Sequence, residues 1–292
     1  MNHVMRIKAF LITILAISSI IVYGQNKIQG YVLDKQTNEP LSYTIISEIH
    51  QKYGSYSDTA GMFTLFFLSE NDSLKVSNLG YSNINICVRD LLKTAKVLLE
   101  PDPFQLQEVV VNSQKTKTKF MEIGFSTKKT NLFIVASYSQ NINSIFIPFP
   151  EKGSIVLIKS VRFTYTLATR NFPLRVRIIS VGTNGEPGDD IVAENIVFSN
   201  YKEGRKQVAV VDITKYNVYM PRNGVFITLE WIMDKAPVTL EQAFQNGPYI
   251  GATKTANPDN SLWINAYNNS KWIEMHRAYI LAIGLTVGNY SK

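Results

Sequence analysis

Apolar and polar residues alternate along most of the chain, and this alternation predicts β-strands. In the first half the runs are short and turn-bounded, as in KIQGYVLD, SLKVSNLGY and NINICVRD. In the second half they are IVLIKSVRFTYTLA, PLRVRIISV, KQVAVVDIT and GVFITLEWI, among others. A period of two indicates strands with one buried face, while MFTLFFL, apolar at nearly every position, suits a strand covered on both sides. RDLLKTA is too short to matter as a helix, and VTLEQAFQN is expected to form a single turn or loop.

Changes in this pattern divide the chain into four parts. Residues 1–24 carry Arg6 and Lys8 before an apolar run, and the run ends at the small pair Val22 and Gly24. This is the pattern of a secretory signal peptide, cleaved before Gln25. The apolar run is shorter than the roughly 20 residues that span a bilayer, so no transmembrane span is expected after cleavage. An uncleaved membrane anchor is the alternative.

The predicted linker is the polar, basic segment Ser113–Lys119. It separates a first β-sandwich over residues 25–112 from a second unit over residues 120–292. Many strands without an intervening helix predict a β-sandwich or jelly roll for the second unit as well. The fold class expected for the whole chain is therefore all-β.

Charge and cysteine content narrow the functional classes. The 292 residues carry a net charge of +7, which falls to +5 once Arg6 and Lys8 leave with the signal peptide. The remaining basic residues are scattered apart from KTKTKF and TKKT, so no nucleic-acid partner is expected. Cys87 is the one cysteine, and it is expected to be a packed or half-buried thiol in a strand.

Turn residues recur at regular places in the first half. Asp34 and Pro40 belong to the turn DKQTNEPL, and Asp58 and Gly61 take the first and last positions of a type I turn. Gly80 stands inside a strand pattern, which suggests a bulge or a close backbone approach. These residues, together with Gly30, determine geometry and supply no proton, metal ligand or nucleophile.

The segments GYVLDKQTNEPLSYTII, SDTAGMFTL, LKVSNLGY and LLEPDPFQLQEVVV resemble the carboxypeptidase regulatory-like domain, a transthyretin-like β-sandwich. The resemblance covers about Gln25–Asn112. It assigns the recurring turn and core positions of the family to Gly30, Asp34, Pro40, Leu41, Asp58, Gly61, Phe63, Gly80 and Tyr81. In Gram-negative envelopes such domains commonly precede a TonB-dependent outer-membrane barrel. The remaining chain is too short for a plug and barrel, so receptor function does not carry over. The second half more weakly resembles a jelly-roll-like module of envelope proteins.

No catalytic or cofactor motif stands out. After signal removal the chain keeps only His50 and His276, and neither lies in a zinc-peptidase spacing. There is no G-x-S-x-G elbow, phosphate loop, dinucleotide turn or C-x-x-C pair. A Ser–His–Asp triad or a pair of glycosidase acids drawn from distant segments remains open. The prediction is a non-enzymatic protein without cofactor or metal.

Two segments are candidates for binding. The turn TNGEPGDD offers Glu186, Asp189 and Asp190 as oxygen ligands for calcium, although it lacks an ordered D-x-D-x-D spacing. The segment SLWINAYNNSKWIEM is a predicted hairpin that brings Trp263, Tyr267 and Trp272 near one another. These rings form either a candidate ligand platform for a sugar or, as the favoured reading, an aromatic group that packs inward.

The sequence thus predicts an exported protein of a Gram-negative envelope, periplasmic or outer-membrane-associated. Its expected work is binding or scaffolding, with the first domain as a docking module and an envelope protein or a glycan as partner. Carbohydrate binding by the second domain is the alternative, and a hydrolase with an unrecognised site is the third.

Overall fold

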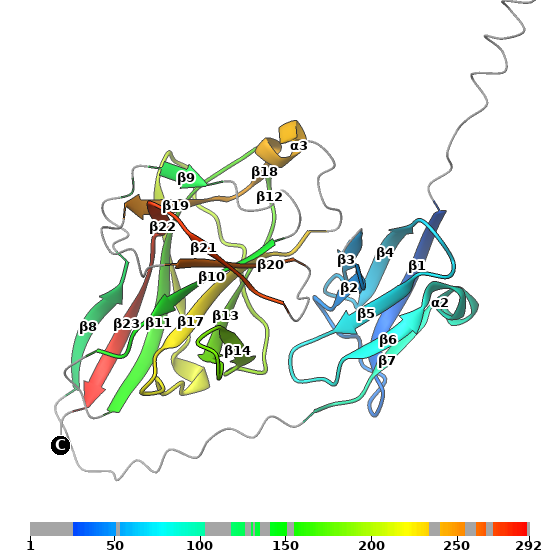
Figure 1. Cartoon of the computed structure of the whole chain (residues 1–292), viewed down its shortest axis with the longest axis horizontal. Coiled ribbons are helices and arrows are strands. Elements are labelled where there is room, and N and C mark those ends of the chain that lie inside the picture. Colours follow the sequence, from blue (N-terminus) through cyan, green and yellow to red (C-terminus); the bar gives the residue numbers. More distant parts are fainter. Residues whose placement is uncertain are drawn as a thin grey trace, which may run out of the picture.

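A computed structural model describes residues 26–50, 53–102, 118–125, 130, 132–134, 141–150, 155–233, 240–254, 261–266 and 271–290. Strands make up most of these residues, so the chain is all-β as predicted (Figure 1). The predicted signal peptide and its cleavage site before Gln25 lie outside the described residues. Within the described part, no helix is both long and apolar enough to cross a membrane.

The first domain is a sandwich of two small sheets. One sheet has the order β4-β1-β7, in which β1 (Asn26–Asp34) pairs antiparallel with β4 (Met62–Phe67) and parallel with β7 (Lys96–Leu99). The other has the order β3-β2-β5-β6, formed by β3 (Gly54–Tyr56), β2 (Ile45–Glu48), β5 (Ser73–Ser77) and β6 (Ile84–Cys87). Because strand side chains alternate between faces, each sheet turns one apolar face toward the other.

The core of this sandwich lies between these apolar faces. Val32, Leu65, Leu74 and Val97 are buried there, each from a different strand. RDLLKTA contributes to α2 (Val88–Thr94), a helix that buries Val88 and Leu91 against the same core. This helix is short, yet it closes one end of the sandwich, which the sequence pattern underestimated.

Two aspartates of the first domain stabilise turns by accepting backbone N–H groups. The Asp34 carboxylate accepts the N–H groups of Gln36 and Thr37 at 2.7 and 2.9 Å and the Tyr81 hydroxyl at 2.8 Å. The Thr37 N–H above all holds the pKa of Asp34 below its ordinary value, with Tyr81 and Gln36 adding to the effect. Asp58 likewise accepts two backbone N–H groups of its own turn at 2.8 and 2.9 Å. Pro40 forms an isolated bridge with Leu33.

Two glycines are required where the chain approaches itself closely. Gly61 has φ +72°, and a Cβ there would lie 2.7 Å from the Val32 carbonyl oxygen. At Gly30 a Cβ would lie 2.5 Å from the Ala95 carbonyl oxygen. Gly80 has φ +77° in the turn after β5, and a Cβ there would lie 3.3 Å from the Ala193 carbonyl oxygen of the second domain. The predicted close approach at Gly80 is therefore a contact between domains.

The second domain contains two larger sheets. The first has the order β14-β13-β17-β10-β20-β21, and β15 pairs with β13 beside this path. Its strands are β14 (Pro187–Asp190), β13 (Leu174–Val181), β17 (Val225–Trp231), β10 (Asn141–Ile147), β20 (Ser261–Ala266), β21 (Ile273–His276) and β15 (Ile196–Phe198). We call it the site sheet, because its outer face meets the first domain.

The other sheet has the order β22-β19-β11-β23-β8, with β16 paired to β11 and β9 paired to β19. Its strands are β22 (Tyr279–Leu281), β19 (Tyr249–Lys254), β11 (Ile155–Thr166), β23 (Ile283–Tyr290), β8 (Thr118–Gly124), β16 (Gln207–Asp212) and β9 (Leu132–Ile134). A two-stranded pair, β12 (Arg170–Asn171) with β18 (Asn246–Gly247), and the 3-10 turn η1 (Thr214–Tyr216) complete the strand regions. The main core of this domain lies between the two large sheets and includes Phe163, Ile178 and Leu229.

Two boundary predictions need correction. The predicted linker Ser113–Lys119 lies mostly outside the described residues, but its last two residues already belong to β8, which pairs with β23. VTLEQAFQN forms more than a single turn, because α3 spans Leu240–Gln245. At β8 the pairing with β23 extends a strand into the polar segment, beyond what local composition indicates.

Candidate functional site

The two domains contact each other through the outer faces of two sheets. Strand β17 is buried at every position, although it lines the main core with only alternate residues. Its other face is covered partly by the first domain, where Ile45 and Tyr56 form a small apolar cluster with Ile232. Figure 1 shows β2 and β3 of the first domain on the side that faces the second domain. An apolar contact of this kind favours a fixed arrangement of the domains.

Buried polar groups accompany this apolar cluster. Tyr56 donates a hydrogen bond of 2.9 Å from its hydroxyl to Glu230 Oε1. Arg175 donates to the Tyr43 carbonyl oxygen, and its Nη1 lies 3.6 Å from Glu230 Oε2. Arg175 and Glu230 are each only 1% exposed. A buried carboxylate with a hydroxyl donor and a guanidinium beside it keeps its charge compensated, which burial requires.

A second ion pair lies next to the first on the site sheet. Arg177 donates from Nε to Asp190 Oδ1 at 2.8 Å and from Nη2 to Asp190 Oδ2 at 2.6 Å, so the pair is bidentate. Its Nη1 also lies 3.9 Å from Glu230 Oε2. Burial alone lowers the pKa of Arg177, but the Asp190 carboxylate outweighs it, and the net pKa is raised. Arg177 is therefore a permanently charged, positioned group.

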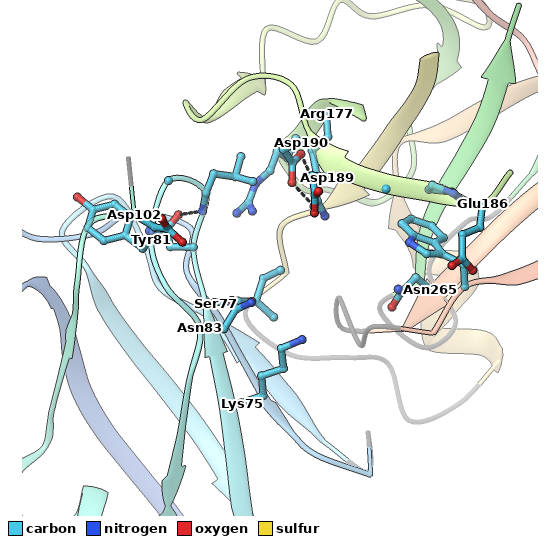
Figure 2. A pocket seen from close by; sticks show the side chains of 18 residues that line it. Lys75, Ser77, Tyr81, Asn83, Asp102, Arg177, Glu186, Asp189, Asp190 and Asn265 are labelled. Atoms are coloured by element: carbon cyan, nitrogen blue, oxygen red, sulfur yellow. Dashed lines mark hydrogen bonds and ion pairs between the residues drawn. The ribbon is translucent and has the colours of Figure 1, made fainter. Parts of the chain in front are cut away.

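A cavity of about 410 Å³ opens beside these pairs, between the domains. Figure 2 shows Lys75, Ser77 and Asn83 of the first domain on one side and residues of the second domain across from them. Both domains supply polar and charged side chains to its wall, and each supplies an aromatic residue, Tyr81 from the first and Trp272 from the second. The principal side chains are Lys75, Asn83, Asp102, Arg175, Arg177, Glu186, Asp189, Asp190, Asn265 and Trp272. This volume falls within the range of small-molecule sites.

The aromatic residues of the predicted hairpin separate in the structure. Trp272 is partly buried and lines the cavity. Trp263 is partly buried on the outer face of the site sheet, where it packs edge-to-face on Phe226 with the ring centroids 6.0 Å apart. Strand pairing places Trp263 opposite Ser144, on the face that also carries Thr228 and not on the main core side. Tyr267 lies outside the described residues, as does the predicted turn.

The acidic turn takes part in the cavity. Glu186, Asp189 and Asp190 all line its wall, and Asp190 is held by Arg177. Across the described residues, no group of three or more His, Cys, Asp or Glu side chains is arranged to hold a metal ion. In the structure the TNGEPGDD turn forms part of the polar wall of the cavity.

His50 and Cys87 both lie away from the cavity. His50 is exposed, and its backbone N–H donates to Glu48 Oε2 at 2.9 Å. Cys87 is partly buried at the end of β6, with its Sγ 3.2 Å from the Glu70 carbonyl oxygen. Neither residue lines the cavity.

A Ser–His–Glu group lies on the hairpin of β20 and β21. Ser261 Oγ is 3.1 Å from His276 Nδ1, and His276 Nε2 is 3.9 Å from Glu274 Oε2. Ser261 is only 4% exposed, and the carboxylate is beyond hydrogen-bond distance from the ring. A nucleophile must reach its substrate, and an orienting carboxylate must bond the histidine. This group therefore has the composition of a triad without its geometry.

Sequence reasoning missed Lys75, Arg175, Arg177 and Glu230. PLRVRIISV and ITLEWI place charged residues at alternate positions inside otherwise apolar strands. This alternation is the ordinary pattern of a strand with one solvent-exposed face, so it gave no signal that the charged face is buried. In the structure the first domain covers part of that face, where Tyr56 bonds Glu230 and Arg175 bonds the Tyr43 carbonyl oxygen.

Comparisons with solved structures give remote likenesses. The structure of the cysteine protease and lectin-like domains of Cwp84, a surface layer associated protein of Clostridium difficile, is 11% identical with a TM-score of 0.37. The alignment covers 89% of this chain and 62% of that chain. Clostridial Cwp84 after propeptide cleavage gives 11% identity and a TM-score of 0.37 over 91% of this chain and 71% of that chain. The structure of infectious bursal disease virus, Gx strain, has 9% sequence identity and a TM-score of 0.24. That alignment covers 93% of this chain and 62% of the other chain. Likenesses this remote carry no argument about activity.

Comparisons of sequence are informative for the first domain. No curated protein matches the chain. Residues 28–111 match the family model of the CarboxypepD_reg-like domain, and this range agrees with the resemblance expected for residues 25–112. The matched residues contain both sheets of the first domain and the turns at Asp34 and Asp58. The first domain of this chain is therefore a CarboxypepD_reg-like domain.

Proposed function

We propose that this chain is an exported, non-enzymatic binding protein of a Gram-negative cell envelope, and that it binds a saccharide in the cavity between its domains. The observation that carries the proposal is the composition of the cavity wall. Two aromatic residues, Tyr81 and Trp272, stand among side-chain amides, carboxylates and cationic groups from two domains. A polar ligand that is ringed by hydroxyl groups suits such a wall.

The wall offers two kinds of contact that saccharides use. The flat face of a sugar ring is apolar and packs on an aromatic side chain such as Trp272. The hydroxyl groups around the ring both donate and accept, and Asn83, Asn265 and Glu186 supply matching acceptors and donors. A few convergent polar groups around an apolar surface give orientation and specificity.

The domain interface supports this proposal because it holds the wall in place. Arg177 is fixed by two hydrogen bonds to Asp190, and Glu230 behind it is bonded by Tyr56 of the first domain. Side chains that are already ordered lose little conformational entropy when a ligand binds. The two domains then act as one binding unit, and neither domain alone contains the whole site.

A glycan array probed with the secreted chain tests the proposal, with Trp272→Ala as the variant. We expect binding to at least one glycan, weakened about tenfold by Trp272→Ala, as the loss of one aromatic contact of about 1.4 kcal/mol implies. Phe120→Ala is the matched control, because Phe120 is an exposed aromatic (62%) on β8, outside the cavity wall. An array without any bound glycan would contradict the proposal, as would equal losses in both variants.

Docking to an envelope protein is a second candidate function, favoured by a separate surface. On the outer face of the sheet β4-β1-β7, Tyr31 is 45% exposed, Met62 39% and Leu98 44%. Strand register places Tyr31 opposite Met62, and Leu33 opposite Leu98, so these side chains share one face. Exposed apolar side chains that lie together on one sheet favour contact with another protein.

Cross-linking in intact envelopes tests this second candidate. If the face docks a protein, Met62→Lys should abolish a discrete cross-linked product that the parent chain gives. Val210→Lys is the control, because Val210 is an exposed apolar residue (60%) on β16 of the second domain. A cross-link pattern that Met62→Lys leaves unchanged would refute docking by this face.

A further inference from the structure

The charged groups of the cavity wall do not balance. Among the lining residues, Arg177 is neutralised by Asp190, and Arg175 lies beside the buried Glu230. Three further carboxylates, Asp102, Glu186 and Asp189, line the wall, and within the described part of the chain none of them forms an ion pair. Lys75 is the ammonium group that stands against them. Together with the buried Glu230, which lies behind the wall, the lining residues therefore carry about two net negative charges at neutral pH.

Lys75 lies partly buried in the wall. Burial lowers the pKa of Lys75, because a desolvated ammonium loses the stabilisation that water gives its charge. The three carboxylates are spread around the opening, with Asp102 on the first domain and Glu186 and Asp189 on the second. A positively charged group in the cavity would therefore have carboxylates on both sides of it.

A buried donor indicates what else the ligand carries. Arg175 lines the cavity, is 1% exposed, and its Nε–H has no hydrogen-bond partner among the described residues. A buried donor without an acceptor costs free energy, and a small movement of the guanidinium toward a ligand oxygen at this wall would recover it. A ligand that complements both the carboxylates and the Arg175 Nε–H carries a cationic group and an oxygen acceptor.

We propose that the saccharide of this site is an amino sugar with a free, positively charged amine. The carboxylates of Asp102, Glu186 and Asp189 are the proposed acceptors for this amine. The inference rests on the proposed saccharide-binding function and specifies its ligand. The sugar ring packs on Trp272, where the electron-rich indole face also attracts the neighbouring cation. The ring hydroxyls supply the oxygen acceptor for Arg175.

Two matched oligosaccharides separate charge from shape. The secreted chain is titrated with a glucosamine tetramer and with the N-acetylglucosamine tetramer, which has the same backbone and no amine charge. We expect the glucosamine tetramer to bind about tenfold more tightly at low salt, since one cation faces two or three partly solvated carboxylates. The preference should shrink as salt is raised from about 0.01 to about 0.5 M, because solvent-exposed charges are screened.

Variants of the wall identify the groups responsible. Asp189→Asn should remove much of the preference for the amine and leave binding of the acetylated tetramer unchanged. Glu186→Gln should also lower the preference, but it should weaken both tetramers, because Glu186 is a proposed acceptor of ring hydroxyls as well. Glu203→Gln is the control, because Glu203 is an exposed carboxylate of the same domain that lies outside the cavity wall. It should leave both affinities as they are in the parent.

The outcomes distinguish this inference from the function on which it rests. Equal or tighter binding of the acetylated tetramer overturns the amine inference and leaves saccharide binding in place. If neither tetramer binds but the array gives another glycan that depends on Trp272, the amine inference again falls alone. If the array is also blank, both fall.

Discussion

Removal of the hydrogen bond from Tyr56 to Glu230 tests the domain interface most directly. It joins residues 174 positions apart in sequence, and it runs from β3 of the first domain to β17 of the second. Tyr56 is 5% exposed and Glu230 1% exposed, so neither group has ready access to water. Tyr56→Phe removes the hydroxyl and leaves the ring in the cluster with Ile45 and Ile232.

The expected cost follows from the environment of the acceptor. A hydrogen bond to a charged group contributes about 1.5–3 kcal/mol, and the loss is greater when the acceptor stays buried without a replacement. Glu230 keeps Arg175 at 3.6 Å and Arg177 at 3.9 Å, which limits the loss. We therefore expect Tyr56→Phe to lower the free energy of unfolding by about 2 kcal/mol, and the melting temperature by about 4–8 °C.

Denaturant and thermal unfolding of the parent and the variant measure this difference. Tyr31→Phe is the matched control, since Tyr31 is 45% exposed on the far sheet of the first domain, and its change should stay within about 0.5 kcal/mol. Circular dichroism should report one transition for the parent, because the interface couples the two domains. If Tyr56→Phe and Tyr31→Phe unfold alike, the domains are not joined through Glu230, and the reasoning about the site fails with it.

Three further outcomes follow from the structure. Gly61→Ala should lower the free energy of unfolding by more than about 2 kcal/mol, because the new Cβ would lie 2.7 Å from a backbone oxygen. Gly185→Ala should lower it by only roughly 1–2 kcal/mol, because Gly185 has φ +80° but open space around it. Equilibrium unfolding measures both losses. Burial, together with the hydrogen bond to Asp34, raises the pKa of the Tyr81 hydroxyl to about 12. The stability that the protonated hydroxyl contributes is therefore complete below about pH 10 and is lost as the pH rises toward 12. Tyr81→Phe should flatten the stability–pH curve in that window, and an unchanged curve would contradict the assignment. Trp263→Ala should cost about 1–2 kcal/mol in thermal unfolding, since the ring is only partly buried; a loss of 3–5 kcal/mol would indicate a core position instead.

Local chemistry made the strands and turns of this protein predictable. Alternation of apolar residues depends only on neighbours in sequence, so runs such as PLRVRIISV could be read as strands without knowing their partners. The turns at Asp34 and Asp58 were equally readable, because each carboxylate bonds backbone N–H groups of its own turn. The order of these motifs also identified the family of the first domain.

The candidate site depended on tertiary structure. Whether a strand residue faces the core or the outside depends on pairing register, since a shift of one position reverses every side chain. The sequence could therefore group the aromatic residues of the SLWINAYNNSKWIEM segment, but it could not place them. The structure places Trp272 in the cavity wall and Trp263 against Phe226 on the outer face of the site sheet. The partners of Glu230 lie on different strands and, for Tyr56, in a different domain. Sequence alone specified the elements because hydrogen bonding and side-chain alternation are local, and only the packed structure decided the site, because it forms where two separately folded faces meet.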